Sequence, residues 1–190
     1  MKKIGITGSL SSGKTTASKI ISFRKGPVFF ADKVVKKIYS SEKFKKIIKR
    51  KFNLDPNINL KDQVRNKIYK NKTNLKKLER IIHPLVRKEM LSFSKKNKKE
   101  NLLFFEIPLL IENGLNNYFD IIFFIRSKKN LRLKRFKSRS KKFSTGLFNF
   151  LNNQQMKDLK KMKYCDHVVV NNKSLSFFKK KLLSIMSNYE

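Results

Sequence analysis

Short apolar runs separated by polar segments predict how the first part of the chain folds. Residues 2–7 predict a buried strand, and apolar side chains at helical spacing predict a helix over residues 14–23. The Gly-Pro pair at 26–27 is a turn signal, and residues 28–31 predict a second short strand. A strand, a glycine-rich turn, a helix and a strand within about 30 residues form a βαβ unit, which implies a parallel sheet.

The remaining pattern predicts a helical middle followed by three more strands. Helical periodicity dominates residues 33–99, where Pro84 should kink or divide the last helix because it removes a backbone donor. The unbroken apolar run at 102–107 predicts a strand buried on both faces. Further strands are expected at 121–125 and 168–170, and further helices at 129–139, at 147–160 and at the C-terminal end after a Ser174 cap. The expected fold class is therefore α/β.

Residues 8–15 carry the strongest chemical signal. They read Gly-Ser-Leu-Ser-Ser-Gly-Lys-Thr and match the P-loop pattern G-x-x-x-x-G-K-[ST], with a strand before and a helix after. Backbone N–H groups and the positive end of a helix dipole form an anion cradle there. Lys14 should reach the β- and γ-phosphates, and the Thr15 hydroxyl should supply an oxygen to Mg²⁺. The expected ATP-binding residues here are Gly8, Ser11, Ser12, Gly13, Lys14, Thr15 and Thr16.

Asp32 narrows the class of P-loop protein. The chain is short, has no evident guanine-reading N-K-x-D motif, and carries this acid directly after its second strand. The carboxyl ends of parallel strands meet at one edge of a sheet, which places Asp32 at the edge that carries the P-loop. There it could accept or orient the proton of a substrate hydroxyl. A helix N-cap is the structural alternative, and the two roles can coexist. These features favour a small-molecule kinase.

The charge of the chain is strongly positive. Lys and Arg total 47 against 13 Asp and Glu, which gives a net charge of +34. Such a surface attracts polyanions, so a nucleic-acid-binding P-loop protein is an alternative from a different class. The lysines, however, are spread along the chain together with abundant Asn, Ile and Phe, and no nucleic-acid motif is evident. We therefore interpret the charge as a bias in residue usage and do not expect a nucleic-acid partner.

Composition argues against a membrane-spanning, secreted or disulfide-bonded protein. No apolar stretch approaches the roughly 20 residues of a membrane span, and the N-terminal apolar run is too short for a signal peptide. Cys165, the only cysteine, cannot form an intrachain disulfide and is expected to be an inert thiol. We expect a cytoplasmic protein without membrane partners. The sequence carries no signal for a particular oligomeric state.

Five segments in order resemble the dephospho-CoA kinase family. Residues 6–16 resemble its P-loop segment, and Asp32 falls at its D-A-D-x-x-A motif. Residues 82–86 (Ile-His-Pro-Leu-Val), 107–112 (Ile-Pro-Leu-Leu-Ile-Glu) and 166–171 (Asp-His-Val-Val-Val-Asn) resemble three further family motifs. The resemblance implies ATP-dependent phosphorylation of the ribose 3′-hydroxyl of dephospho-CoA, the last step of coenzyme A synthesis.

The resemblance also implies an architecture and residue roles. The fold would be that of P-loop kinases: one domain over residues 1–190 with a five-stranded parallel sheet, a helical acceptor-side insert at about 33–99 and a lid at about 136–155. Asp32 and Lys14 would be catalytic together with Arg139, and Asp32 would engage the acceptor hydroxyl. The other implied contacts are Lys61, His83 and Arg87 to the acceptor, Lys134 and Arg135 to the phosphates, and Asn171 near the adenine.

Several positions depart from the family pattern. Phe30 replaces the first Asp of D-A-D, and Lys61 stands where an arginine is usual, which weakens bidentate phosphate recognition. Ser9 is the small residue after the first P-loop glycine, and Ser140 and Leu151 replace lid residues that are commonly acidic and basic. Another nucleoside or nucleotide kinase with the same fold is the nearest alternative.

Overall fold

The computed structural model describes residues 1–55, 58–71, 73–139 and 144–189 of the chain. These residues form two compact units, Met1–Phe30 with Asn97–Glu190, and Ala31–Lys96, and each unit is described by itself. Among the described residues, no helix is both long and apolar enough to cross a membrane.

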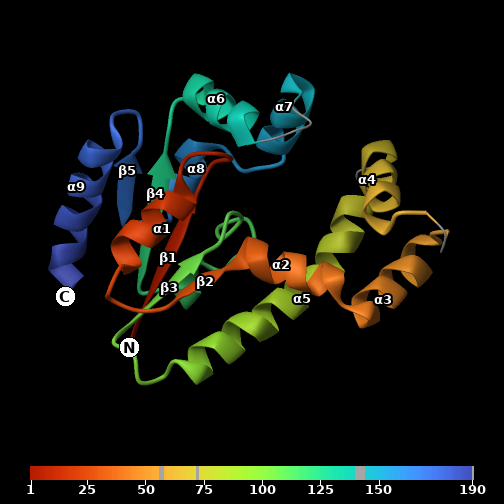
Figure 1. Ribbon diagram of the computed structural model, residues 1–190, viewed down its shortest axis with the longest axis horizontal. Helices are drawn as coiled ribbons and strands as arrows, with labels where there is room; N and C mark the ends of the chain where they lie inside the picture. Colours follow the sequence, from red (N-terminus) through yellow and green to blue (C-terminus); the bar gives the residue numbers. More distant parts are fainter. Residues whose placement is uncertain (56–57, 72, 140–143, 190) are drawn as a thin grey trace. The chain divides into compact units, whose positions relative to one another are not determined.

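The first unit contains a parallel sheet (Figure 1). Its strands, in the spatial order β2-β3-β1-β4-β5, pair in parallel throughout. Their bounds are β1 (Lys2–Gly8), β2 (Val28–Phe30), β3 (Leu102–Glu106), β4 (Ile121–Arg126) and β5 (His167–Val170). This arrangement confirms the predicted five-stranded parallel sheet. Because the strands are parallel, their carboxyl ends share one edge, where β1 leads into the loop at residues 8–15.

The first unit also contains helices. They are α1 (Lys14–Ser22), α6 (Lys129–Arg139), α7 (Thr145–Asn153), α8 (Asp158–Met162) and α9 (Leu175–Met186), with short 3₁₀ turns at Asn116–Tyr118 and Ser187–Tyr189. Ile21 of α1 and Phe178 of α9 are buried in one cluster with Ile4, Phe104 and Phe123 of the sheet. The helices α1 and α9 therefore pack on the same face. The predicted Ser174 cap of α9 is confirmed, since its side chain accepts from Phe177 N.

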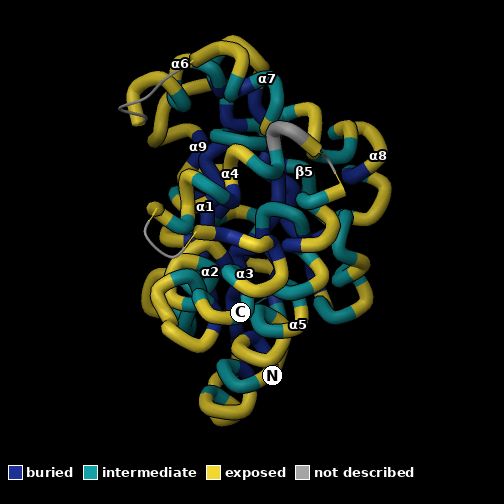
Figure 2. The backbone as a smooth tube through the Cα atoms, turned by 90° about the vertical axis from the view of Figure 1, so that its right-hand side faces the viewer, coloured by how far each residue is buried: buried dark blue, intermediate teal, exposed yellow. Residues whose placement is uncertain are grey.

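The opposite face of the sheet is also covered. The ring of Phe105 packs against Phe29 and against Phe119, with centroids 5.8 Å and 5.3 Å apart. Every residue of β3 is buried, and the chain coloured by burial in Figure 2 shows where the buried segments lie. The prediction of a strand buried on both faces is confirmed for β3. Removal of this much apolar surface from water is the main force that stabilises a sheet of this kind.

The second unit is entirely helical in its described part. It consists of α2 (Ala31–Ser40), α3 (Glu42–Phe52), α4 (Leu60–Lys70) and α5 (Thr73–Lys96). Phe44 and Ile48 of α3, Val64 of α4, and Leu78 and Ile82 of α5 share one buried cluster. Ser41 caps α3 by accepting from Phe44 N. The unit therefore has its own hydrophobic core and spans nearly the residues of the predicted helical insert.

Three local predictions need correction. The strand β2 ends at Phe30, and Ala31 already belongs to α2. The helix α5 is not divided at Pro84, whose side chain is exposed, because the buried face that includes Leu78 and Met90 extends on both sides of it, and the alternative of a kink stays a prediction. The helix predicted over 147–160 is two helices, α7 and α8, separated by a segment whose polar groups bond to other parts of the unit.

Candidate active site

The loop between β1 and α1 has the backbone shape that the P-loop pattern predicts. Gly8, Ser11 and Gly13 all have positive φ angles, of 147°, 57° and 102°. A Cβ at Gly13 would lie 2.3 Å from Nδ2 of Asn171, and one at Gly8 would lie 2.3 Å from the backbone oxygen of Ile125. The contact at Gly8 is with backbone and could not be relieved, whereas at Gly13 the clash is with the end of a side chain and the positive φ is the stronger reason for glycine.

Lys14 stands at the beginning of α1 with its side chain directed into the loop. Its Nζ donates to the backbone oxygens of Gly8 and Ser9, at 3.0 Å and 2.9 Å. The residue is only 8% exposed, so its ammonium is held by the loop and not by solvent. Together with the N-terminus of α1, this cation gives the loop a concentrated positive potential suited to phosphates.

Thr15 is paired with an acid that the sequence reasoning missed. Its Oγ1 donates to Oε1 of Glu106 at 2.7 Å. Glu106 is the last residue of β3 and is 6% exposed, so a carboxylate is buried beside the P-loop hydroxyl. A hydroxyl and a carboxylate are the oxygen ligands that Mg²⁺ prefers. Among the described residues, no group of three or more His, Cys, Asp and Glu is arranged so that it could hold a metal ion by itself.

Arg135 and Asn171, both predicted to bind ATP, meet at the other side of the loop. Asn171 Nδ2 donates to the backbone oxygen of Ser12 at 2.9 Å, and Arg135 Nη2 donates to the backbone oxygen of Asn171 at 3.0 Å. Burial, and secondarily the neighbouring charge of Arg139, lower the pKa of Arg135. The structure therefore brings both residues to the P-loop, where they bond to its backbone or to each other.

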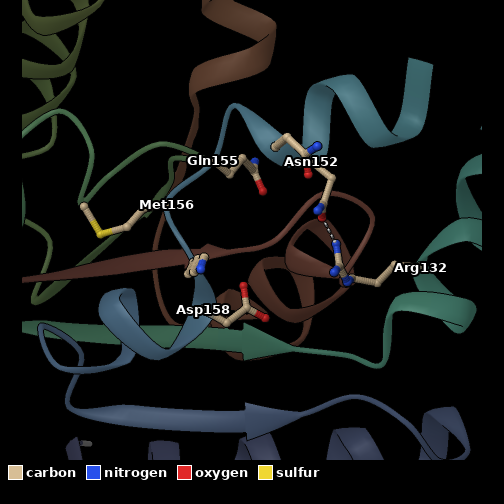
Figure 3. Close-up of a pocket in the computed structure, with 7 residues that line it drawn as sticks. Arg132, Asn152, Gln155, Met156 and Asp158 are labelled. Atoms are coloured by element: carbon tan, nitrogen blue, oxygen red, sulfur yellow. Dashed lines mark hydrogen bonds between the residues drawn. The ribbon is translucent and has the colours of Figure 1, made fainter. Parts of the chain in front are cut away.

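The outer arc of the P-loop, Ser9 and Leu10, is held by residues that follow β4. Leu10 N donates to Oε1 of Gln155 at 2.9 Å, and Ser9 Oγ donates to Oδ1 of Asp158. Arg132 Nη1 donates to the backbone oxygen of Leu10 at 3.3 Å. Arg132, Gln155 and Asp158 also line a pocket of about 440 Å³ (Figure 3). Burial lowers the pKa of Arg132, and the charge of Asp158 partly opposes that shift.

The second unit carries the predicted acceptor-side residues. Asp32 is exposed and lies in the first turn of α2, one residue inside the helix, so the N-cap alternative is replaced by a first-turn position. A carboxylate there interacts favourably with the helix dipole. Lys61 lies in the first turn of α4 and is exposed. Both side chains are thus accessible to a ligand.

His83 and Arg87 lie on one face of α5 with Glu79, since the three are spaced by four residues. Burial lowers the pKa of His83, Glu79 acts in the opposite direction, and Arg87 lowers the pKa further. Because the ordinary pKa of histidine is about 6.5, His83 is neutral at pH 7 and can both donate and accept hydrogen bonds. Within the 82–86 motif, His83 is the polar residue, and it lies on this face of α5.

The predicted lid is only partly described. Arg139 is the last residue of α6 and is exposed, and Leu151 lies exposed on α7. Ser140 falls outside the described residues, as does the rest of 140–143. Phe30 ends β2 and pairs in register with Glu106 of β3. The strand β2 therefore ends beside the buried Glu106, and Asp32 follows two residues later in the sequence.

Cys165 agrees with the expected inert thiol. Its Sγ donates to the backbone oxygen of Lys161 at 3.2 Å, and the residue is half-buried. Burial, with the nearby charge of Asp166, raises the pKa of the thiol to about 12. At neutral pH it is therefore protonated and poorly nucleophilic.

Fold and site together define a class of protein: a P-loop kinase, with a phosphate loop at the carboxyl edge of a parallel sheet and a buried carboxylate beside its threonine. A model of the dephospho-CoA kinase family matches residues 2–176. A dephospho-CoA kinase of Fusobacterium nucleatum is 32% identical over 185 residues, which cover 93% of each chain. This chain belongs to the dephospho-CoA kinase family.

Solved structures are similar in fold. A dephospho-CoA kinase from Campylobacter jejuni superposes with a TM-score of 0.70 at 26% identity, covering 98% of this chain and 96% of that one. A Thermus thermophilus protein, TT1252, superposes with a TM-score of 0.84 at 25% identity and covers 100% of this chain and 98% of that one. The predicted P-loop kinase fold is thereby confirmed.

Proposed function

We propose that the protein transfers the γ-phosphoryl group of ATP to the ribose 3′-hydroxyl of dephospho-CoA and so produces coenzyme A. The observation that carries this proposal is the P-loop with Lys14 held inside it, in a chain whose family match extends over residues 2–176. A cytoplasmic location stays a prediction of the sequence.

The chemistry is mainly electrostatic. The N–H groups of the loop and the N-terminus of α1 bind the phosphates, and Lys14 stabilises the charge that spreads over the transferred group. Asp32 orients the acceptor hydroxyl and takes up its proton. Arg139 supplies further positive charge from the lid side, and Lys61, His83 and Arg87 bind the acceptor. Arg135 and Asn171 support the nucleotide side of the site through Ser12.

The site fits Mg²⁺ by its donor set. Thr15 Oγ1 and the carboxylate of Glu106 are hard oxygen donors next to the phosphate loop, and they would hold the ion directly or through water. When bound, Mg²⁺ neutralises phosphate charge during transfer. The role of Glu106 in this chain is then to orient Thr15 and to supply the negative charge that attracts the cation.

We expect Glu106→Gln to weaken the dependence on Mg²⁺ selectively. The amide keeps an oxygen that can accept from Thr15 but removes the charge, and such partners typically change metal affinity about 10- to 100-fold. The Mg²⁺ concentration for half-maximal activity should rise accordingly, measured at saturating ATP. Glu100→Gln, an exposed acid just before β3, is the matched control and should leave it unchanged. An unaltered Mg²⁺ profile in Glu106→Gln would assign this carboxylate a purely structural role.

The assignment of the acceptor is tested by ADP release. With Mg·ATP, the wild type should release ADP only when dephospho-CoA is present, and nucleosides, nucleotides and shikimate should not replace it. Lys14→Met should abolish the release and so attribute it to this P-loop. If a nucleoside or nucleotide supports faster release than dephospho-CoA does, the substrate assignment is wrong and the related-kinase alternative replaces it.

A further inference from the structure

The outer arc of the P-loop is held partly by the loop itself, where Lys14 Nζ and Ser12 N donate to the Ser9 carbonyl, and partly by long-range contacts. Its Leu10 N–H is bound by Gln155, its Leu10 carbonyl by Arg132 and its Ser9 hydroxyl by Asp158. The partners follow their loop residues by 122 to 149 positions in the sequence. The Leu10 N–H, the Leu10 carbonyl and the Ser9 hydroxyl are thus all bonded to the region between β4 and β5.

Gln155 is itself held in place by its surroundings. It lies in the segment that separates α7 from α8, and the next residue, Met156, donates its N–H to Oε1 of Glu112 at 3.0 Å. The same Glu112 oxygen is 2.6 Å from Nζ of Lys161 on α8. On the other side, Asn152 at the end of α7 accepts from Arg132 at 2.7 Å (Figure 3). The Gln155 oxygen therefore meets Leu10 from a fixed position.

We propose that Gln155 is a positioning residue for phosphate binding, a role that rests on the proposed ATP site. By accepting from Leu10 N–H it holds one end of the peptide between Ser9 and Leu10, whose carbonyl at the other end accepts from Lys14 Nζ at 2.9 Å and from Ser12 N at 3.1 Å. The N–H groups of the following loop residues are then already oriented for the phosphates. A loop ordered in advance does not lose conformational freedom when ATP binds, and affinity improves by that amount.

This role predicts an effect on phosphates specifically. Gln155→Met keeps the length and bulk of the side chain but removes the acceptor for Leu10 N–H. Loss of one such hydrogen bond should weaken the binding of ATP by about fivefold. Tripolyphosphate, which lacks the nucleoside, should weaken by the same factor. The KM for dephospho-CoA should not change, because none of the residues proposed to bind the acceptor takes part in the hydrogen bonds described for this arc.

The test is calorimetric titration of ATP and of tripolyphosphate into the wild type, Gln155→Met and Gln154→Met. Gln154 is the exposed neighbour of Gln155, so its methionine variant is a matched control and should bind like the wild type. Equal affinities in the two variants would overturn the proposal, as would a loss confined to ATP. The acceptor is absent from these titrations, so an error in the assignment of dephospho-CoA leaves them intact.

A second measurement can overturn the proposal with the wild type alone. In the wild type without nucleotide, the Leu10 amide should be protected from hydrogen exchange, and Gln155→Met should remove this protection. Exchange of the wild-type Leu10 amide at the rate of an unstructured peptide would overturn the proposal by itself.

Discussion

Asp32→Asn is expected to lower kcat for dephospho-CoA phosphorylation by about 1,000-fold, within the range typical of a lost general base. Asparagine has the same shape and can still hydrogen-bond to the acceptor hydroxyl, but it cannot take up the proton. The affinity for ATP, measured by titration in the absence of acceptor, should stay close to that of the wild type. A fall in kcat with intact ATP binding would show that Asp32 acts in the transfer step and not in the binding of ATP by the P-loop.

The first-turn position of Asp32 requires a control for helix stability. Loss of an acid at a helix N-terminus costs about 0.3–1 kcal/mol, which by itself cannot produce so large a loss of activity. Glu42→Gln makes the same change in the first turn of α3 in the same unit, and this exposed acid pairs only with Lys45 among the contacts described here. Its activity should equal that of the wild type. A kcat for Asp32→Asn within a few-fold of the control would remove Asp32 from the catalytic step.

Elements with a strong local signal were predictable from the sequence. The strands β1, β3 and β4 are apolar runs with clear boundaries, and their burial follows from that composition alone. The P-loop was equally visible because its glycines, lysine and threonine lie within residues 8–15, and Gly8 and Gly13 both have the positive φ angles that favour glycine. Local patterns suffice where the physical cause is itself local.

Elements shaped by distant contacts were mispredicted. The amphipathic pattern of 147–160 continues without a break, yet Met156 gives its N–H to Glu112 and the helix is interrupted there. Pro84 shows the opposite case, since packing of α5 on both sides outweighs the loss of one backbone donor. Neither outcome is encoded in the neighbouring residues, because tertiary contacts decide both.

The residues of the candidate site also differ in whether their role could be predicted from the local sequence. Glu106 was predictable from the sequence, because it is the last residue of an apolar strand, much as Asp32 closely follows one. Acids at the carboxyl ends of parallel strands lie at the edge of the sheet where ligands bind. Gln155, Asp158 and Arg132 carry no such signal, because their importance comes from contact with Ser9 and Leu10 across more than a hundred residues. The sequence thus predicts which groups bind phosphate but not which groups hold them.

Glu112→Gln is expected to lower the free energy of unfolding by about 3–5 kcal/mol, because it leaves a buried cation without its counter-charge. The Lys161 side chain is 0% exposed, and its Nζ lies 2.6 Å from Oε1 of Glu112, whose side chain is 16% exposed. The glutamine can still accept from Met156 N, so the loss reports the charge and not that hydrogen bond. Urea unfolding of the variant and of the exposed control Glu100→Gln measures it.

The double variant Glu112→Gln/Lys161→Met completes the argument, since it removes both buried charges. Methionine fills a similar volume without an ammonium, and apolar replacement of a buried pair is often neutral or stabilising. The double variant should therefore recover most of the stability that Glu112→Gln loses. If Glu112→Gln alone unfolds like the wild type, the Lys161 ammonium must be solvated, and the ion pair contributes nothing to holding α8. If the double variant is as unstable as the single one, Glu112 stabilises the segment before α8 by some means other than charge.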